Sequence, residues 1–176
     1  MPRLPLVSLS EFPPGLRAVT ERGRSSGMLS TTVPVQVWAH RPEVATAWLQ
    51  ALEQLHVHGL LGMRLRELVR LKIASITNCG ACRLARKSDT VSEADLAELA
   101  CLPHDSERFS PPERAALHYA TLFAGDYAAI DDAFYGELAR WFSVPEIVEL
   151  NMFCALMLAG GRMTYVQQAY EEASTT

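Results

Sequence analysis

The sequence contains no long apolar run and no sustained alternation of β-branched with polar residues. The longest nearly uncharged stretch, Leu150 to Gly161, has 12 residues and is too short to cross a bilayer. Sheet strands show a period of two, and the nearest approach to it, Thr31 to Trp38, is interrupted by Pro34. These absences argue against a membrane-spanning chain and against a fold that contains a sheet.

An excess of basic residues is also missing. The chain has 16 Lys and Arg against 20 Asp and Glu, a formal net charge of −4. Proteins that bind nucleic acids need a basic surface for the phosphates, so we expect no nucleic-acid partner. Residues 1–14 contain four prolines and no apolar core segment, so we expect no signal peptide and a cytoplasmic protein.

Cysteine is scarce, and in a reducing compartment the four cysteines should not form a disulfide framework. Two of them form the pair Cys79-Gly80-Ala81-Cys82. Such a pair in a cytoplasmic protein indicates redox chemistry, a metal site or coincidence. A third cysteine, Cys154, lies in the most apolar predicted helix, where we expect it only to pack.

Helix signals cover most of the chain. Pro42 opens one predicted helix that Gly59 closes, and a second is predicted over Leu61 to Ile76. The apolar face expected for the first is formed by Val44, Trp48, Leu52 and Leu55.

Three capping boxes predict further helix starts, because a serine oxygen and a carboxylate three residues later satisfy free amides of the first turn. They begin at Ser92, Ser110 and Ser143, and the last helix is expected to end near Gly160 and Gly161. Asp131 or Asp132 should cap one more, running through Trp141. We predict an all-α fold of about seven to nine helices in a single domain, 1–176, with an arm at 1–14 and a tail at 171–176.

The cysteine pair has a sequence context that favours a reactive thiolate. Asn78 is a good helix cap, so a helix is predicted to begin at Cys79, with both sulfurs on one face. The free amides and dipole of a helix N-terminus lower the pKa of a thiol, and Arg86, four residues after Cys82, would add to this effect. A second nearby thiol can then resolve a sulfenic acid.

A structural zinc site and a chance pair of small buried residues remain alternatives. The spacing of Cys79, Cys82, Cys101 and His104 fits four tetrahedral zinc ligands. Against this, the predicted helices between the two ligand pairs need not return Cys101 to the first pair.

Glu67 is the other candidate. It falls on a partly apolar helix face, one helix before the cysteines, where a carboxylate could accept a proton with a raised pKa. The alternative is a plain ion pair with Arg64, Arg70 or Lys72.

Taken together, these residues resemble a known family. Glu67, eleven residues and then the cysteine pair, preceded by Arg64-x-Arg66 and followed by Pro112-Glu113-Arg114-Ala115-Ala116-Leu117, is similar to the carboxymuconolactone decarboxylase-like superfamily. Within it, the chain looks most like the alkylhydroperoxidase D and peroxidase-related branch. The similarity spans about Val35 to Gly160.

The resemblance implies an oligomeric all-α fold, commonly a trimer or hexamer, that reduces hydroperoxides with thiols and without metal or flavin. It implies that Cys82 is the peroxidatic thiol, Cys79 the resolving thiol and Glu67 part of a proton relay, with an external dithiol as reductant. The family's histidine position is Arg86 here. Because arginine does not exchange protons near neutral pH, the proton would come from Glu67, solvent or a histidine such as His40.

Two other functions stay open. One is a decarboxylase-type enzyme that acts on a lactone or acid and does not use the dithiol. The other is a helical oligomer with a structural zinc.

Overall fold

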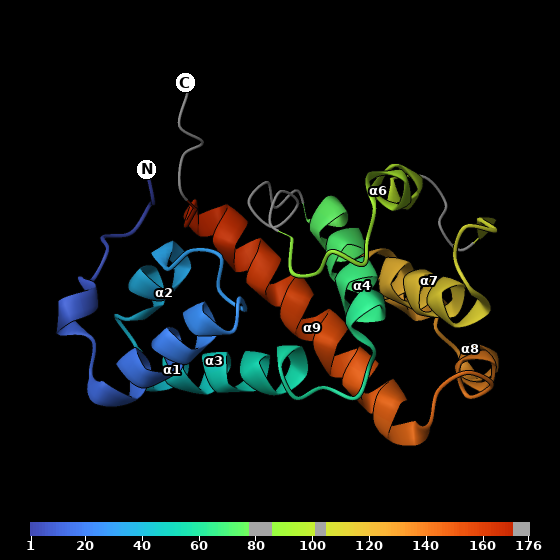
Figure 1. Cartoon of the computed structure of the whole chain (residues 1–176), viewed down its shortest axis with the longest axis horizontal. Coiled ribbons are helices and arrows are strands. Elements are labelled where there is room, and N and C mark those ends of the chain that lie inside the picture. The colour runs from blue at the N-terminus through green and yellow to red at the C-terminus, as the bar shows by residue number, and fades with distance from the viewer. Residues whose placement is uncertain (78–85, 101–104, 171–176) are drawn as a thin grey trace. The chain divides into compact units, whose positions relative to one another are not determined.

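The computed structural model describes residues 1–77, 86–100 and 105–170, and these residues form eight α-helices and no strand (Figure 1). The helices are α1 (Pro14–Ser25), α2 (Val33–Trp38), α3 (Pro42–His56), α4 (Met63–Ile76), α6 (Glu93–Leu99), α7 (Pro111–Gly125), α8 (Asp132–Leu138) and α9 (Val144–Gln167). Short 3₁₀ helices cover Leu9–Glu11 and Tyr127–Ala129. The all-α prediction is confirmed.

The chain divides into two compact units. Unit 1 comprises Met1–His58 and Arg162–Thr176, and unit 2 comprises Gly59–Gly161. The single-domain assignment of the sequence stays a prediction.

Unit 1 is built on α1 and α3, which pack against each other. Its core consists of Phe12, Leu16, Val19, Met28, Val35, Ala39, Ala45 and Leu49. The bounds predicted for α3 are close, and its buried face differs in part: Ala45, Leu49 and Leu55 are buried, whereas Val44 is exposed. Three of the four predicted face residues agree with the structure, because Leu55 is buried and Trp48 and Leu52 are partly buried against the unit 1 core. Val44 is the exception, since it lies at the border of a pocket.

Unit 2 is organised around α4, which packs against α7 and α6. The core of this packing is Leu68, Leu71, Val91, Leu99, Phe109 and Leu117. Lys72 lies inside the apolar arc of α4 and is buried, and its ammonium donates to the carbonyl oxygen of Leu99 at 3.0 Å. This bond satisfies a charged group in the interior and joins α4 to the end of α6.

The predicted capping boxes are present at the helix starts. The Ser92 hydroxyl accepts from the Asp95 amide at the start of α6, and Asp131 caps α8 through the Phe134 amide. At Ser110 and Ser143 the carboxylates of Glu113 and Glu146 accept from the serine amides.

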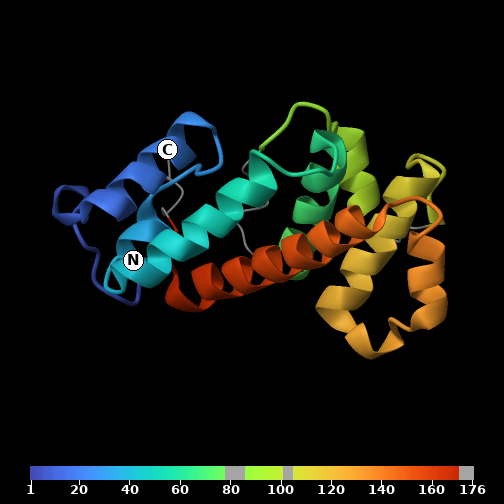
Figure 2. The same ribbon diagram turned by 90° about the horizontal axis from the view of Figure 1, so that it is seen from below.

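Helix α9 does not end at Gly160 and Gly161 as expected. It runs unbroken to Gln167, which both ribbon views show (Figures 1 and 2). A Cβ built at Gly161 would lie 2.8 Å from Oγ1 of Thr77, so this glycine serves a close helix contact rather than a helix end.

By length and composition, helix α9 is able to cross a membrane. The sequence analysis missed this because it considered only the longest stretch without charged residues. One such helix is a weak indication, because the core helix of a soluble protein has the same properties. Within unit 2, Leu150, Phe153 and Cys154 of α9 are fully buried, and Glu149 accepts from the amides of Leu60 and Leu61 at 2.7 and 2.9 Å.

Candidate functional site

Glu67 lies in the middle of α4 and is 2% exposed. Arg70, one turn later on the same helix, donates from Nε to Oε2 and from Nη2 to Oε1, both at 2.7 Å. Both side chains are buried, and two parallel bonds of this kind form the strongest geometry of an arginine–carboxylate pair. The ion-pair alternative for Glu67 therefore holds, with Arg70 as its partner.

A third donor reaches the same carboxylate from another part of the chain. The backbone N–H of Lys87 donates to Oε1 of Glu67 at 3.0 Å. Lys87 follows Cys82 by five residues in sequence. The buried carboxylate thus holds the backbone directly after the segment that carries the cysteine pair.

The Lys87 side chain completes this group of charges, and the sequence analysis did not single it out. Burial, the positive charge of Arg70 and, in the opposite direction, the negative charge of Glu67 together lower the pKa of Lys87 from 10.5 to about 8. An ammonium with this pKa exchanges protons near neutral pH. Sequence reasoning had no signal for it, because the burial of a lysine in a turn depends on what the rest of the chain covers.

Arg86 lies beside Lys87 in sequence, but its environment is different. It is exposed, and its Nη2 is 3.7 Å from Oε1 of Glu93, in the first turn of α6. An exposed ion pair whose atoms are this far apart contributes little to the stability of the folded protein.

A second group of charged side chains links the three helices α4, α6 and α7. Arg64 of α4 donates to Asp95 of α6 at 3.0 Å and to Glu113 of α7 at 2.8 Å, and Arg108 donates to Asp95 at 2.7 Å. Burial raises the pKa of Asp95, but the hydrogen bonds from Arg64, Ser92 and Arg108 outweigh burial and hold it well below its ordinary value. This group fixes the position of α6.

The remaining predicted site residues are placed as follows. Cys79, Cys82 and the other two residues of the zinc hypothesis, Cys101 and His104, lie outside the described residues. Cys154 is fully buried in α9, and burial raises the pKa of its thiol, so the prediction that it only packs is confirmed.

Two further observations concern the alternatives for proton delivery and metal. His40 belongs to unit 1, and its Nε2 donates to the carbonyl oxygen of Pro5 at 2.9 Å. Across residues 1–77, 86–100 and 105–170, no three His, Cys, Asp or Glu side chains gather as a metal site would require.

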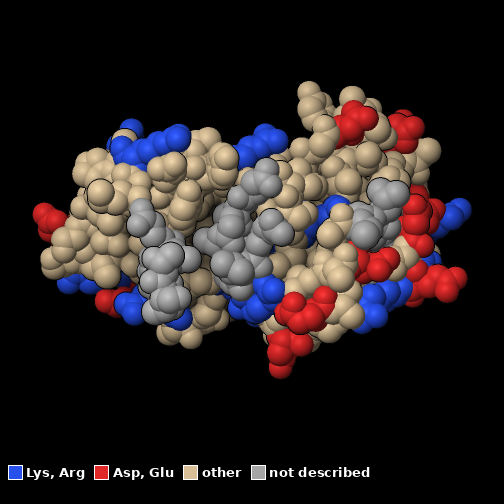
Figure 3. Space-filling view, turned by 90° about the horizontal axis from the view of Figure 1, so that it is seen from above, with Lys and Arg blue, Asp and Glu red and all other residues tan. Residues whose placement is uncertain are grey.

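The surface over these elements carries both signs of charge. In the view from above, basic side chains occur on both halves of the picture, whereas most of the acidic side chains lie in the right half (Figure 3).

No family model and no curated protein sequence matches the chain. Solved structures do. An uncharacterised peroxidase-related protein with an alkylhydroperoxidase AhpD core, from Ralstonia eutropha JMP134, is 18% identical with a TM-score of 0.74, over 97% of this chain and 92% of that one. This chain has the alkylhydroperoxidase D-like fold. The resemblance predicted from Glu67 and the cysteine pair is confirmed at the level of the fold.

Two other structures with the alkylhydroperoxidase D-like fold extend the comparison. A peroxidase-related protein from Silicibacter sp. TM1040 is 16% identical, with a TM-score of 0.75, over 98% of this chain and 92% of that one. The debrominase Bmp8 is 18% identical, with a TM-score of 0.77, over 96% of this chain and 91% of that one. Proteins of this fold therefore include peroxidase-related proteins and a debrominase.

Proposed function

We propose that this protein is a cytoplasmic, soluble thiol-dependent oxidoreductase that reduces hydroperoxides with Cys82 and Cys79 and uses neither metal nor flavin. The observation that carries the proposal is the Glu67 carboxylate, which is buried, paired with Arg70, and bonded to the backbone directly after the cysteine segment. Burying two charges costs desolvation free energy, which is not needed merely to hold a turn in place. A role in the chemistry explains why this ion pair is buried. The alkylhydroperoxidase D-like fold adds support.

The proposed reaction takes two electrons from the dithiol. The Cys82 thiolate bonds to the distal oxygen of the hydroperoxide, the O–O bond breaks, and the leaving alkoxide takes a proton to become an alcohol. Cys82 is then a sulfenic acid. The Cys79 sulfur attacks the Cys82 sulfur, hydroxide leaves with a proton as water, and the disulfide closes. An external dithiol reduces the disulfide and is itself oxidised.

The histidine of the family pattern would both favour the thiolate and donate a proton. In this chain we assign these two roles to two basic residues. Arg86 favours the Cys82 thiolate but cannot give up its proton. Lys87, whose pKa is about 8, carries a proton at neutral pH and can release it, so we assign it the protonation of the leaving alkoxide. Glu67, which the family pattern places in the proton relay, holds Lys87 in position by accepting from its backbone amide.

The same two electrons could reduce a carbon–halogen bond instead. The structural likeness to the debrominase Bmp8, whose cysteine-to-alanine variant has been crystallised with 2,3,4-tribromopyrrole, favours this second candidate. A brominated aromatic would lose bromide and gain hydrogen while the dithiol becomes a disulfide. A decarboxylase-type reaction and a structural zinc remain as outcomes of the test.

The deciding experiment is stopped-flow mixing of the reduced protein with tert-butyl hydroperoxide, and in a parallel arm with 2,3,4-tribromopyrrole, followed by thiol titration. We expect two thiols to disappear together with the peroxide. Cys82→Ser should abolish this loss, and Cys101→Ser should leave it unchanged. Thiols that survive peroxide but are lost to tribromopyrrole would favour the debromination, and thiols that survive both would overturn the dithiol function. Metal analysis of protein purified without added zinc tests the zinc site.

Variants around Glu67 separate chemistry from stability. Replacing a buried ion pair by apolar residues is often neutral for stability, so Glu67→Leu with Arg70→Met should fold while it loses the peroxide reaction. Lys87→Met should slow turnover and remove a pH dependence near 8. Arg86→His should raise turnover. A folded double variant with wild-type turnover would remove Glu67 from the mechanism.

A further inference from the structure

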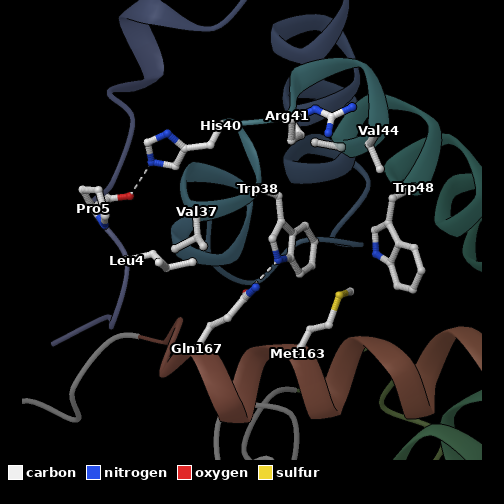
Figure 4. A pocket seen from close by; sticks show the side chains of 11 residues that line it. Leu4, Pro5, Val37, Trp38, His40, Arg41, Val44, Trp48, Met163 and Gln167 are labelled. Atoms are coloured by element: carbon white, nitrogen blue, oxygen red, sulfur yellow. Dashed lines mark hydrogen bonds between the residues drawn. The ribbon is translucent and has the colours of Figure 1, made fainter.

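Unit 1 contains an open pocket of about 530 Å³, within the size range of small-molecule sites. Its walls come from the N-terminal arm, α2, α3 and the last two turns of α9, all in unit 1 (Figure 4). The pocket is lined mainly by apolar and aromatic side chains: Leu4, Val37, Trp38, Val44, Ala45, Trp48 and Met163.

Two tryptophans give the pocket its chemical character. The ring centroids of Trp38 and Trp48 are 6.2 Å apart, and the ring planes are 71° from parallel. Figure 4 shows both rings above Met163, with Nε1 of Trp48 on the side that faces Trp38. Indole faces and a thioether together favour a flat aromatic body over a flexible aliphatic one.

Of the two indole N–H groups that line the pocket, one donates to a side chain and the other has no acceptor among the described residues. Trp38 Nε1 donates to Oε1 of Gln167 at 3.0 Å. Trp48 Nε1 is buried and has no hydrogen-bond partner among the described residues. A buried donor without an acceptor is unfavourable, and a ligand oxygen would relieve it.

A cation stands at the edge of this apolar pocket. Arg41, the residue before α3, borders the pocket, and its guanidinium forms no hydrogen bond or ion pair with any residue the structure describes. Most arginines of the chain that are named above have a carboxylate partner, for example Arg64 with Glu113. An unpaired guanidinium beside an aromatic pocket complements an anion carried by an apolar body.

We propose that this pocket binds a small planar aromatic acid, with its ring system packed against the indoles of Trp38 and Trp48 and the thioether of Met163, and with its carboxylate at Arg41. The site lies in unit 1, and it does not depend on the cysteine chemistry proposed for unit 2.

The test is isothermal titration of the full-length protein with naphthalene-2-carboxylate and with the neutral naphthalene-2-carboxamide, with tryptophan fluorescence as a second readout. The carboxylate should bind in a ratio of one to one and about tenfold more tightly than the amide, a difference typical of one charge-assisted hydrogen bond. Arg41→Met should remove that difference and leave amide binding unchanged. Arg24 also belongs to unit 1, has no ion pair with the residues that the structure describes and does not line the pocket, so Arg24→Met should have no effect.

A blocked pocket gives the independent check. Val44 is exposed at the rim, so Val44→Trp should fill the entrance without disturbing the core and abolish binding of both compounds. Equal affinity for acid and amide would overturn the role of Arg41. No binding by the wild-type protein, together with a change of oligomeric mass in Val44→Trp, would overturn the proposal and identify the pocket as a contact between copies of the chain.

Discussion

Thr77 and Gly161 approach so closely that a single added methyl group would not fit: a Cβ on Gly161 would lie 2.8 Å from Oγ1 of Thr77. Thr77 directly precedes the cysteine segment in sequence, and Gly161 lies inside α9. The contact therefore sets how closely the end of α4 lies to α9 within unit 2.

Gly161→Ala should lower the free energy of unfolding by about 1–3 kcal/mol, because overpacking forces the helices or the threonine to shift. Chemical denaturation measures it. Gly136→Ala is the matched control: it lies in α8 with open space around it, and should stabilise by about 0.5–1 kcal/mol. Adding Thr77→Ala to Gly161→Ala should restore most of the loss. Simple additivity of those two changes would contradict the contact.

The lowered pKa of Lys87 predicts that the folded protein becomes more stable as the pH rises into the alkaline range. Its pKa is lowered from 10.5 to about 8 in the folded protein, so between these values the unfolded chain binds more protons than the native state. The penalty for the buried charge is fully present below pH 8 and is relieved as the pH rises from about 8 to 10.5, by up to about 2 kcal/mol after solvent screening. Denaturant titrations of wild type and Lys87→Met over this range should show the rise in the wild type alone. Parallel curves would contradict the lowered pKa.

Asp95 predicts a loss of stability in acid. Since hydrogen bonds from Arg64 and others hold its pKa below the ordinary value, its contribution is present above the unfolded pKa of about 4. It is lost as the pH falls from there through the lower folded pKa. Asp95→Asn should cost about 3 kcal/mol at neutral pH and flatten the acid limb. Glu93→Gln, 88% exposed, should change stability by less than about 0.5 kcal/mol.

Helix α9 predicts self-association. Val144, Val148 and Met152 recur every four residues, and they are 74%, 47% and 58% exposed, an apolar stripe on unit 2. We propose that this stripe forms the contact between copies in the trimer or hexamer that the family resemblance implies. Light scattering should give a mass above one chain for the wild type, and Met152→Glu should reduce it. Tyr127→Glu, at a residue that is 76% exposed and lies outside α9, should not reduce the mass. A monomeric wild type would refute the contact.

Much of the fold could be read from sequence because its signals are local. The capping boxes at Ser92 and Ser110 place the helix starts correctly, since a serine and a carboxylate three residues later act within one turn. Glycine misled the analysis at Gly161, because the same residue ends a helix or permits a close contact, and only the presence of Thr77 distinguishes the two.

The same distinction between local and long-range information applies to the candidate site. The sequence by itself determined the all-α class and the cysteine pair, and it marked Glu67 as a candidate, because residue type and spacing carry that information. Only the tertiary structure decided which basic neighbour pairs with Glu67 and that the Lys87 amide reaches the same carboxylate. It alone showed that Arg41, whose guanidinium has no partner among the described residues, borders the same pocket as two tryptophans. Those relationships depend on burial and on which distant segments meet, and no local pattern records either.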